Sequence, residues 1–324
     1  MWKDILINLR SLDLRTRIAF LSALAAIIVY YFVGAPYYQS LLMAIAMYVV
    51  LCSSWNIISG ITGYVSFGHV VFWGLGAYIT AVLIVRWNLP WPFALLGAGL
   101  GTALFCLIIS YPILKLSEVY FAISMLALAE TVRVLVSYFR GLTGGGGGIY
   151  LRPLVRVDSA YLMMALLAFA VVAGMLIMRD TRFMKSLVAI NNNELAAESL
   201  GIKTTWRKTQ AFVLSAVFPA LAGGIYVLNV AFIDPRTAFD IGITLNIIMM
   251  TVFGGLATVM GPVIGPIVFM LLAETLWSRF PFVHRAVLGV VIVLLVIFLP
   301  QGILPSFRKW LDRLRRRAGT EAGS

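Results

Sequence analysis

Long apolar runs, each close to the length of a membrane crossing, dominate this sequence of 324 residues. A helix needs about 20 mainly apolar residues to cross the hydrocarbon layer of a bilayer. Hydrophobic residues make up 61% of the chain and charged residues only 12%, which excludes an ordinary soluble domain. The runs lie at 18–35, 39–59, 69–86, 92–114, 116–139, 160–178, 210–232, 242–257, 262–276 and 284–300. The sequence therefore predicts an all-α integral membrane protein with about ten transmembrane helices.

The basic residues lie mainly between the apolar runs and indicate how the chain is oriented. Lys and Arg concentrate in cytoplasmic segments of membrane proteins. Ten spans with both termini in the cytoplasm put the polar loop 179–210 inside and the loop 141–159 outside. That arrangement places 17 of the 25 Lys and Arg residues inside. It also explains the isoelectric point near 10.0 without a nucleic-acid partner.

Three regions follow from this pattern. Residues 18–300 form the predicted transmembrane domain, and 301–324 form a basic cytoplasmic tail. Residues 1–17 are basic and carry apolar side chains at helical spacing, from Trp2 to Leu9. This spacing is typical of an amphipathic helix that lies on the lipid surface.

The polar loop 179–210 contains a short predicted helix from Glu194 to Leu200. Asn193 can cap its first turn, and Gly201 suits the left-handed residue after its last turn. Glu194 is expected to act mainly through the helix dipole, and Glu198 to meet donors of a partner protein. Such a short helix is marginal alone in water, so it is expected to dock on a partner. The alternative is a solvated connecting loop. The apolar residues of the predicted helix are Leu195, Ala196, Ala197 and Leu200.

Glycine and proline interrupt the apolar runs at two places, before His69 and between Leu245 and Leu272. Irregular backbone at membrane depth persists where it is buried in protein or lines a cavity. Paired breaks in two halves of a chain point to a transporter pathway, with broken or re-entrant helices. Close helix packing through small residues is an equally good interpretation. The candidate pathway residues are Gly60, Gly63, Ser66, His69, Gly254 and Gly255.

Glu130 and Arg133 lie three positions apart within a predicted span. Charges at that depth are costly, so each is the expected partner of the other in an intramembrane ion pair. A structural ion pair is favoured over direct contact with a substrate.

Enzyme chemistry has little support in the sequence. Ser66 and His69 lack a third catalytic group, and His69 and His284 are too few to form a metal cluster. No GxxxxGK[ST] motif occurs, so the chain is not expected to hydrolyse ATP, and no cofactor or metal is expected. The run Gly144–Gly148 in the outer loop is predicted to be too flexible to form an element.

Four ordered blocks resemble the permease subunits of branched-chain amino-acid ABC importers, the LivM type. The first block, Trp55–Ala81, contains N-x-x-x-G-x-x-G-x-x-S-x-G-H. The others are Tyr120–Val134, Ser186–Ile202 and Met249–Gly265, and the likeness covers most of residues 38–300. The resemblance implies the ABC importer permease fold in a bacterial inner membrane.

The resemblance also implies partners and a role for the short helix. It matches the coupling helix that fits a groove on the ATP-binding subunit, with Glu194, Ala197, Glu198 and Gly201 at the motif positions. The implied partners are a second permease of similar fold, two ATP-binding subunits and an extracytoplasmic substrate-binding protein. Related permeases carry branched-chain amino acids, other amino acids, urea or short amides. The alternative from another class is an ion-coupled secondary transporter, for which Glu130 is the deepest carboxylate.

Overall fold

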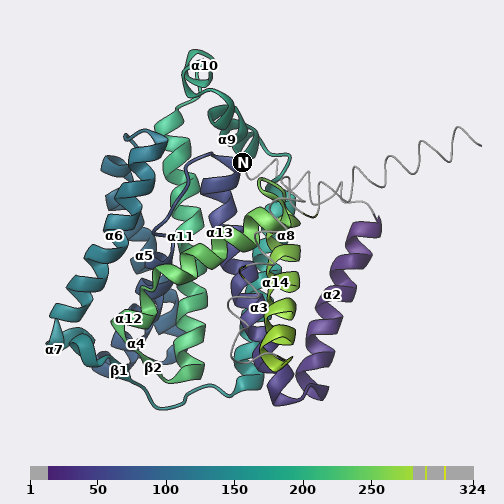
Figure 1. Cartoon of the computed structure of the whole chain (residues 1–324), viewed down its shortest axis with the longest axis vertical. Coiled ribbons are helices and arrows are strands. Elements are labelled where there is room, and N and C mark those ends of the chain that lie inside the picture. The colour runs from purple at the N-terminus through teal and green to yellow at the C-terminus, as the bar shows by residue number, and fades with distance from the viewer. Residues whose placement is uncertain (1–13, 280–288, 290–302, 304–324) are drawn as a thin grey trace, which may run out of the picture.

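The computed structural model describes residues 14–279 together with the single residues 289 and 303. Helices standing side by side make up most of it (Figure 1). In chain order the elements are α2 Leu14–Val33, α3 Pro36–Trp55, the π-helical turn η1 Asn56–Ile61, α4 Val70–Trp87, α5 Trp91–Ile113, α6 Glu118–Tyr138, α7 Arg140–Thr143, the 3₁₀ turn η2 Gly145–Gly147, β1 Ile149–Tyr150, α8 Val157–Met178, α9 Arg182–Asn192, α10 Glu194–Ser199, α11 Thr204–Val230, β2 Phe232–Ile233, α12 Pro235–Ala238, α13 Ile241–Gly255 and α14 Gly261–Arg279.

Within the described residues, seven helical segments are long and apolar enough to cross a membrane. They are Pro36–Ile61, Val70–Trp87, Trp91–Ile113, Glu118–Tyr138, Val157–Met178, Thr204–Val230 and Pro235–Gly255. Two other predicted spans match the shorter apolar helices Ser22–Val33 and Gly261–Leu276. The chain is therefore a multi-pass helical membrane protein. Three predicted segments lie largely outside the described residues. Of the surface helix 1–17 only residues 14–17 are described, and of the span 284–300 and the tail 301–324 only residues 289 and 303.

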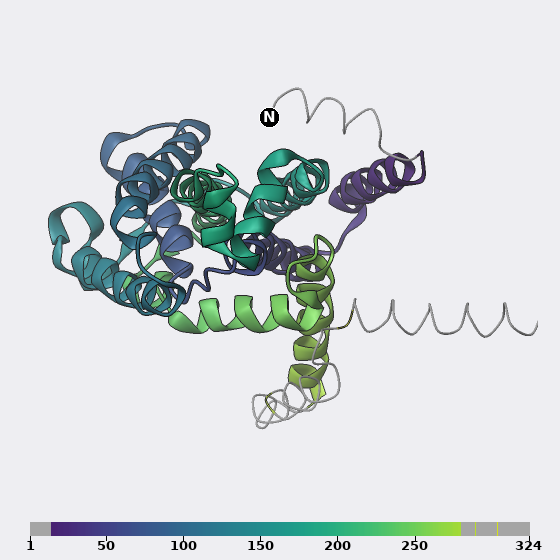
Figure 2. The same cartoon turned by 90° about the horizontal axis from the view of Figure 1, so that it is seen from above.

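The helices divide into a buried centre and an exposed periphery. In the continuous segment of α3 and η1, 78% of the most apolar stretch is buried inside the chain, and in α11 the share is 67%. In α6 it is only 22%. α11 packs against α4, α5 and α3, while α3 also packs against α8 and α14. Figure 2 shows α13 lying crosswise along one side of this bundle, where it leads into α14.

Glycine allows α4 and α11 to touch backbone to backbone. A methyl group on Gly76 would lie 2.0 Å from the carbonyl oxygen of Ala220, and one on Gly223 would lie 2.1 Å from that of Trp73. Contacts this close bring more backbone and side-chain atoms into van der Waals range than larger residues would permit. Small residues therefore serve packing at this interface.

The two long polar loops emerge at opposite ends of the bundle (Figure 1). α9 and α10 lie at one end, while α7, β1 and β2 lie at the other. The prediction that Gly144–Gly148 is too flexible to form an element is wrong, because Gly145–Gly147 form η2 and β1 pairs antiparallel with β2. Gly148 has a φ of +75°, and a methyl group there would lie 2.3 Å from the carbonyl oxygen of Ile233. The run is thus packed against a segment far along the chain.

Candidate functional site

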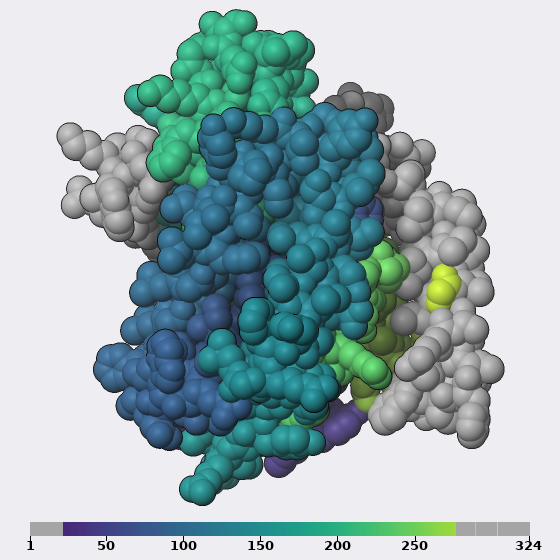
Figure 3. All heavy atoms as spheres, turned by 90° about the vertical axis from the view of Figure 1, so that its left-hand side faces the viewer, coloured from purple at the N-terminus to yellow at the C-terminus, as the bar shows by residue number. Residues whose placement is uncertain are grey.

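α10 projects beyond the neighbouring helices at its end of the bundle (Figures 1 and 3). Its predicted first turn is confirmed, because the side chain of Asn193 accepts a hydrogen bond from the Ala196 N–H at 3.0 Å. Leu195 and Leu200 are 76% and 82% exposed. Two large apolar side chains therefore face outward, Leu195 from within the helix of six residues and Leu200 from the residue that caps its end.

The end of α10 is a Schellman motif. Gly201 has a φ of +82°, as its predicted left-handed position requires. Its N–H donates to the carbonyl of Glu198 at 2.8 Å, and the N–H of Ile202 donates to the carbonyl of Ala197 at 3.1 Å. Ala197 is buried, so it packs the inner face of the helix. Ala197 and Gly201 thus shape the helix, because Ala197 is buried and Gly201 has no side chain to offer a partner.

Glu194 reaches inward and joins an ionic cluster, which we define as Tyr64, Glu194 and Lys208. The Lys208 Nζ lies 2.6 Å from the Glu194 Oε1. The Tyr64 hydroxyl donates to the Glu194 Oε2 at 2.7 Å, and the Lys208 Nζ donates to the Tyr64 hydroxyl oxygen at 2.9 Å. Partial burial alone would raise the pKa of the Glu194 carboxyl, but the hydrogen bonds from Lys208 and Tyr64 outweigh it and lower that pKa. Glu194 is therefore held as a carboxylate.

Lys208 is placed differently from the sequence prediction. The sequence assigned it to the water-facing loop before a span at 210–232, but α11 already begins at Thr204. Lys208 is 4% exposed, and its Nζ also donates to the carbonyl of Leu114 at 3.1 Å. A buried cation is tolerated when its charge is paired and its hydrogens are bonded, and both conditions hold for Lys208. The expectation that Glu194 acts mainly through the helix dipole missed its direct bonds to Lys208 and Tyr64.

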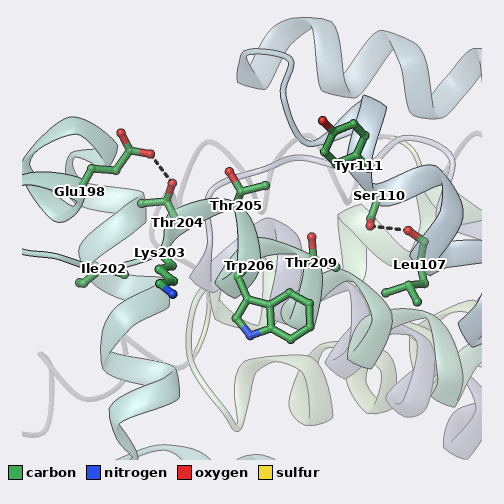
Figure 4. Close-up of a pocket in the computed structure, with 10 residues that line it drawn as sticks. All are labelled: Leu107, Ser110, Tyr111, Glu198, Ile202, Lys203, Thr204, Thr205, Trp206 and Thr209. Atoms are coloured by element: carbon green, nitrogen blue, oxygen red, sulfur yellow. Dashed lines mark hydrogen bonds between the residues drawn. The ribbon is translucent and has the colours of Figure 1, made fainter.

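Glu198 lies on the exposed side of α10 and already has a partner within the chain. Its Oε1 accepts a hydrogen bond from the Thr204 Oγ1 at 2.6 Å. Figure 4 shows this bond at the edge of a cavity of about 540 Å³, which Tyr111 and Trp206 also line. The carboxylate therefore helps to close the turn between α10 and α11 and remains accessible from outside.

The two glycine breaks meet each other, and we call this contact the glycine junction, comprising Asn56, Gly60, Gly254 and the turn 255–261. The Asn56 Nδ2 donates to the carbonyl of Thr258 at 2.8 Å, and the Asn56 Oδ1 accepts from the Ala257 N–H at 3.0 Å. A methyl group on Gly254 would lie 1.9 Å from the carbonyl oxygen of Gly261. The junction includes a π-helical turn, a distortion that is frequent at functional sites.

The other predicted pathway residues are also enclosed by the chain. Ser66 and His69 are fully buried, and the His69 ring lies edge-on to Phe72 with the centroids 5.3 Å apart. The carbonyl of Ser66 accepts from the Trp55 Nε1 at 2.9 Å. Gly63 has a φ of +90° and lies beside the Asn191 side chain of α9. Gly255 is buried, with a φ of +128°.

Glu130 and Arg133 pair with each other on α6, as predicted. The Arg133 Nε donates to the Glu130 Oε2 at 2.9 Å on the periphery of the bundle, in α6. Their side chains are 51% and 33% exposed, respectively. The pair therefore faces away from the packed centre of this chain.

Sequence reasoning did not single out Asn56, Tyr64 or Lys208. The sequence did carry a signal for Lys208, which lies two residues before the apolar run 210–232. If the helix begins before that run, the lysine is part of the helix and needs a partner for its charge. Asn56 and Tyr64 lay inside a recognised motif block, but their contacts depend on segments more than a hundred positions away.

Comparisons with known proteins agree with the motif blocks. Residues 37–297 match the family model described as branched-chain amino acid transport system / permease component. The high-affinity branched-chain amino acid transport system permease protein LivM of Salmonella typhimurium is 26% identical, over 86% of this chain and 71% of the relative. The LivM protein of Escherichia coli K12 is also 26% identical, over 82% and 69%.

A probable branched-chain amino acid transport permease protein LivM of Methanocaldococcus jannaschii is 22% identical, over 72% of this chain and 70% of the relative. No solved structure matches the chain. The family model spans most of the chain and confirms the resemblance of the four blocks. The chain belongs to the family of permease components of branched-chain amino acid transport systems.

Proposed function

We propose that this chain is the membrane permease subunit of an ATP-driven importer for branched-chain amino acids. The observation that carries the proposal is the shape of α10 in a chain of this family. A capped helix of six residues projects from the bundle with Leu195 and Leu200 largely exposed. Such a helix gains persistence by docking, and exposed leucines suit an apolar groove on an ATP-binding subunit.

The proposed complex contains a second homologous permease, two ATP-binding subunits and an extracytoplasmic substrate-binding protein. In this complex the chain crosses a bacterial inner membrane ten times, with both termini and the loop 179–210 in the cytoplasm. The basic residues of that loop support this orientation. α10 contacts the ATP-binding subunit through Leu195, Leu200 and Glu198, while Ala197 and Gly201 keep its shape.

The translocation pathway is proposed to run beside the glycine junction. Gly60, Gly63, Ser66, His69, Gly254 and Gly255 lie in or next to irregular backbone, which suits a hinge between helices. Because most of these residues are buried within the chain, they are proposed to act by changing helix packing. Direct contact with the cargo then falls to surfaces that the second permease completes.

The alternative of a stand-alone ion-coupled transporter has less support. Its coupling site needs a deep carboxylate that is free to bind an ion. Glu130 is paired with Arg133 and lies on the periphery. Urea or a short amide remains the alternative cargo for the ABC complex.

Uptake of radiolabelled leucine into proteoliposomes tests the proposal. The vesicles hold the purified complex, with ATP and Mg²⁺ on the ATPase side and the binding protein on the other. We expect uptake that needs ATP and the binding protein and resists excess urea or acetamide. Uptake driven by a proton or sodium gradient without ATP would support the carrier instead.

A charge reversal in α10 tests the docking step. Glu198→Arg places a cation where the proposed groove meets a carboxylate and removes the bond to Thr204. We expect normal membrane insertion, since the change lies outside the candidate spans, together with weaker ATPase association and lost uptake. Unchanged association and uptake would exclude Glu198 from the docking surface.

A further inference from the structure

The ionic cluster connects parts of the chain that are remote in sequence. Tyr64 and Glu194 are 130 positions apart, and Tyr64 and Lys208 are 144 apart. Lys208 also holds the carbonyl of Leu114 at the end of α5. Thus α10, α11, the end of α5 and the segment between η1 and α4 meet at one buried ammonium group.

The bonds of α10 differ in how far they reach. Asn193 bonds to the N–H of Ala196, and Glu198 bonds to Thr204, so these contacts reach no further than the first residue of α11. The bonds of Glu194 to Tyr64 and Lys208 lead out of the loop and into the bundle. Glu194 is therefore well placed to transmit a displacement of α10.

The segment that receives this contact leads on to the glycine junction. Tyr64 follows η1, and the Tyr64 N–H donates to the carbonyl of Ile58 within η1 at 3.1 Å. Asn56 in the same turn holds the backbone of residues 257 and 258 through its side-chain amide. A path of hydrogen bonds therefore runs from α10 through Tyr64 to the second glycine break.

Burial gives this connection strength that a surface ion pair lacks. Lys208 is 4% exposed and Tyr64 is 5% exposed, while the Glu194 side chain is 31% exposed. Ion pairs with both partners exposed are weakened by water and salt, whereas separating this pair leaves the charge of the buried Lys208 uncompensated. A movement of Glu194 therefore pulls its two partners along, because breaking the bonds is costly.

We propose that the ionic cluster of Tyr64, Glu194 and Lys208 is the link through which motion of α10 reaches the glycine junction. The inference rests on the proposed docking of α10 on an ATP-binding subunit, and it names the residues that pass the motion inward. All three are positioning residues, because they contact neither ATP nor the cargo. The cluster couples ATP hydrolysis to transport and does not serve only to hold the fold.

The test compares single and paired replacements. Lys208→Met leaves Glu194 without its cation, while Glu194→Leu with Lys208→Met removes both charges and keeps apolar bulk. Replacing both partners of a buried pair often restores stability, since no lone charge remains. Lys185→Met is the matched control, because Lys185 is an exposed lysine of the same loop.

The first measurement is amide hydrogen exchange of residues 193–202 in the permease without ATP-binding subunits. We expect exchange to be faster by roughly tenfold in both the single and the paired variant, since each loses the ion pair that ties α10 to the bundle. Lys185→Met should match the unmodified chain. Unchanged exchange in Lys208→Met would overturn the link, and this result is independent of whether ATPases dock on α10.

The second measurement is leucine uptake per ATP hydrolysed in proteoliposomes of the whole complex. We expect the paired variant to fold and assemble normally but to carry roughly tenfold less leucine per ATP. Restoration of the normal ratio in the paired variant would show that the cluster is only structural. If Glu198→Arg leaves ATPase association intact while the paired variant loosens α10, the docking proposal fails and the cluster as an anchor of α10 survives.

Discussion

The ionic cluster and the glycine junction hold the same stretch of chain, residues 56–69, but they do so in opposite ways. At the glycine junction, Gly60 lies so close to the turn after α13 that a methyl group on it would be 3.0 Å from the Ala257 backbone nitrogen, and the Asn56 side chain bonds to the backbone there. At the ionic cluster, contact is made by the ends of three long side chains. The backbone contact cannot shift without overlap, whereas the side-chain contact stays bonded while the attached backbone moves.

This difference suits a segment that is fixed at the glycine junction and moves at the ionic cluster. Closely packed backbone keeps its geometry until the packing itself changes, because any small shift produces overlap. Lysine, glutamate and tyrosine have several rotatable bonds between backbone and polar group, so they keep their hydrogen bonds through small movements. We infer that the stretch 56–69 pivots on the glycine junction when α10 moves.

The largest effect is expected from filling the glycine junction. In Gly254→Ala the new methyl group meets backbone atoms of Gly261 and Gly265, which cannot turn aside as a side chain can. We expect destabilisation at or above the upper end of the usual cost of overpacking, about 1–3 kcal/mol. The measurements are yield and thermal stability of the purified permease.

Gly174→Ala in α8 is the control for that substitution. A methyl group there meets nothing within 4 Å, so we expect a neutral or slightly favourable change. Equal behaviour of the two variants would show that the glycine junction has room after all.

A smaller effect is expected from removing the side-chain amide that closes the junction. Asn56→Ala deletes the bonds to Thr258 and Ala257 and leaves both backbone groups without that partner. An unsatisfied buried polar group costs about 1–3 kcal/mol, so the permease should fold with lower stability and transport poorly. Thermal unfolding and leucine uptake check this. Unaltered values in both would show that the Asn56 bonds do not hold the glycine junction together.

A still smaller effect is expected from weakening the ionic cluster without breaking its charge pair. Tyr64→Phe keeps the ring that packs edge-on to Phe121, with centroids 5.4 Å apart, and loses only the hydroxyl. The loss of stability should be about 1 kcal/mol, with full assembly and a few-fold fall in leucine carried per ATP. A loss of assembly as severe as in Gly254→Ala would contradict the division between the two contacts.

The smallest effect is expected from mild acid. Because the pKa of Glu194 is lowered in the folded chain, its stabilising contribution is fully present above the unfolded value of about 4.3 and declines as pH falls through the folded value. Protection of the α10 amides, corrected for intrinsic exchange, should therefore stay constant from about pH 8 to pH 5. A fall in protection already near neutral pH would show that Glu194 is not held as a carboxylate.

Features that depend on neighbouring residues were predictable from the sequence, and contacts between distant segments were not. The capping role of Asn193 and the left-handed Gly201 follow from local chemistry, and both are confirmed. The burial of Lys208 depends on Tyr64 and Leu114, which are 144 and 94 positions away. The order in Gly144–Gly148 likewise depends on pairing with β2, which local flexibility does not reveal.

For the glycine breaks, the positions were predictable from the sequence, but the contact between them was not. Their positions could be recognised because glycine and proline interrupt apolar runs. That the two breaks touch through Asn56 required the fold, since nothing in either segment names the other. The sequence therefore supports the interpretations as pathway and as packing equally.

Cysteine cross-linking from α10 tests the central claim most directly. The native Cys52 and Cys106 are fully buried, so a single introduced cysteine dominates the reaction. The test variant is Leu200→Cys, because the Leu200 side chain is 82% exposed. The control is Tyr150→Cys, because the Tyr150 side chain is 75% exposed at the opposite end of the bundle. In membranes holding the whole complex, we expect a short bifunctional reagent to join residue 200, but not residue 150, to an ATP-binding subunit. A cross-link from residue 150 with none from residue 200 would contradict the account.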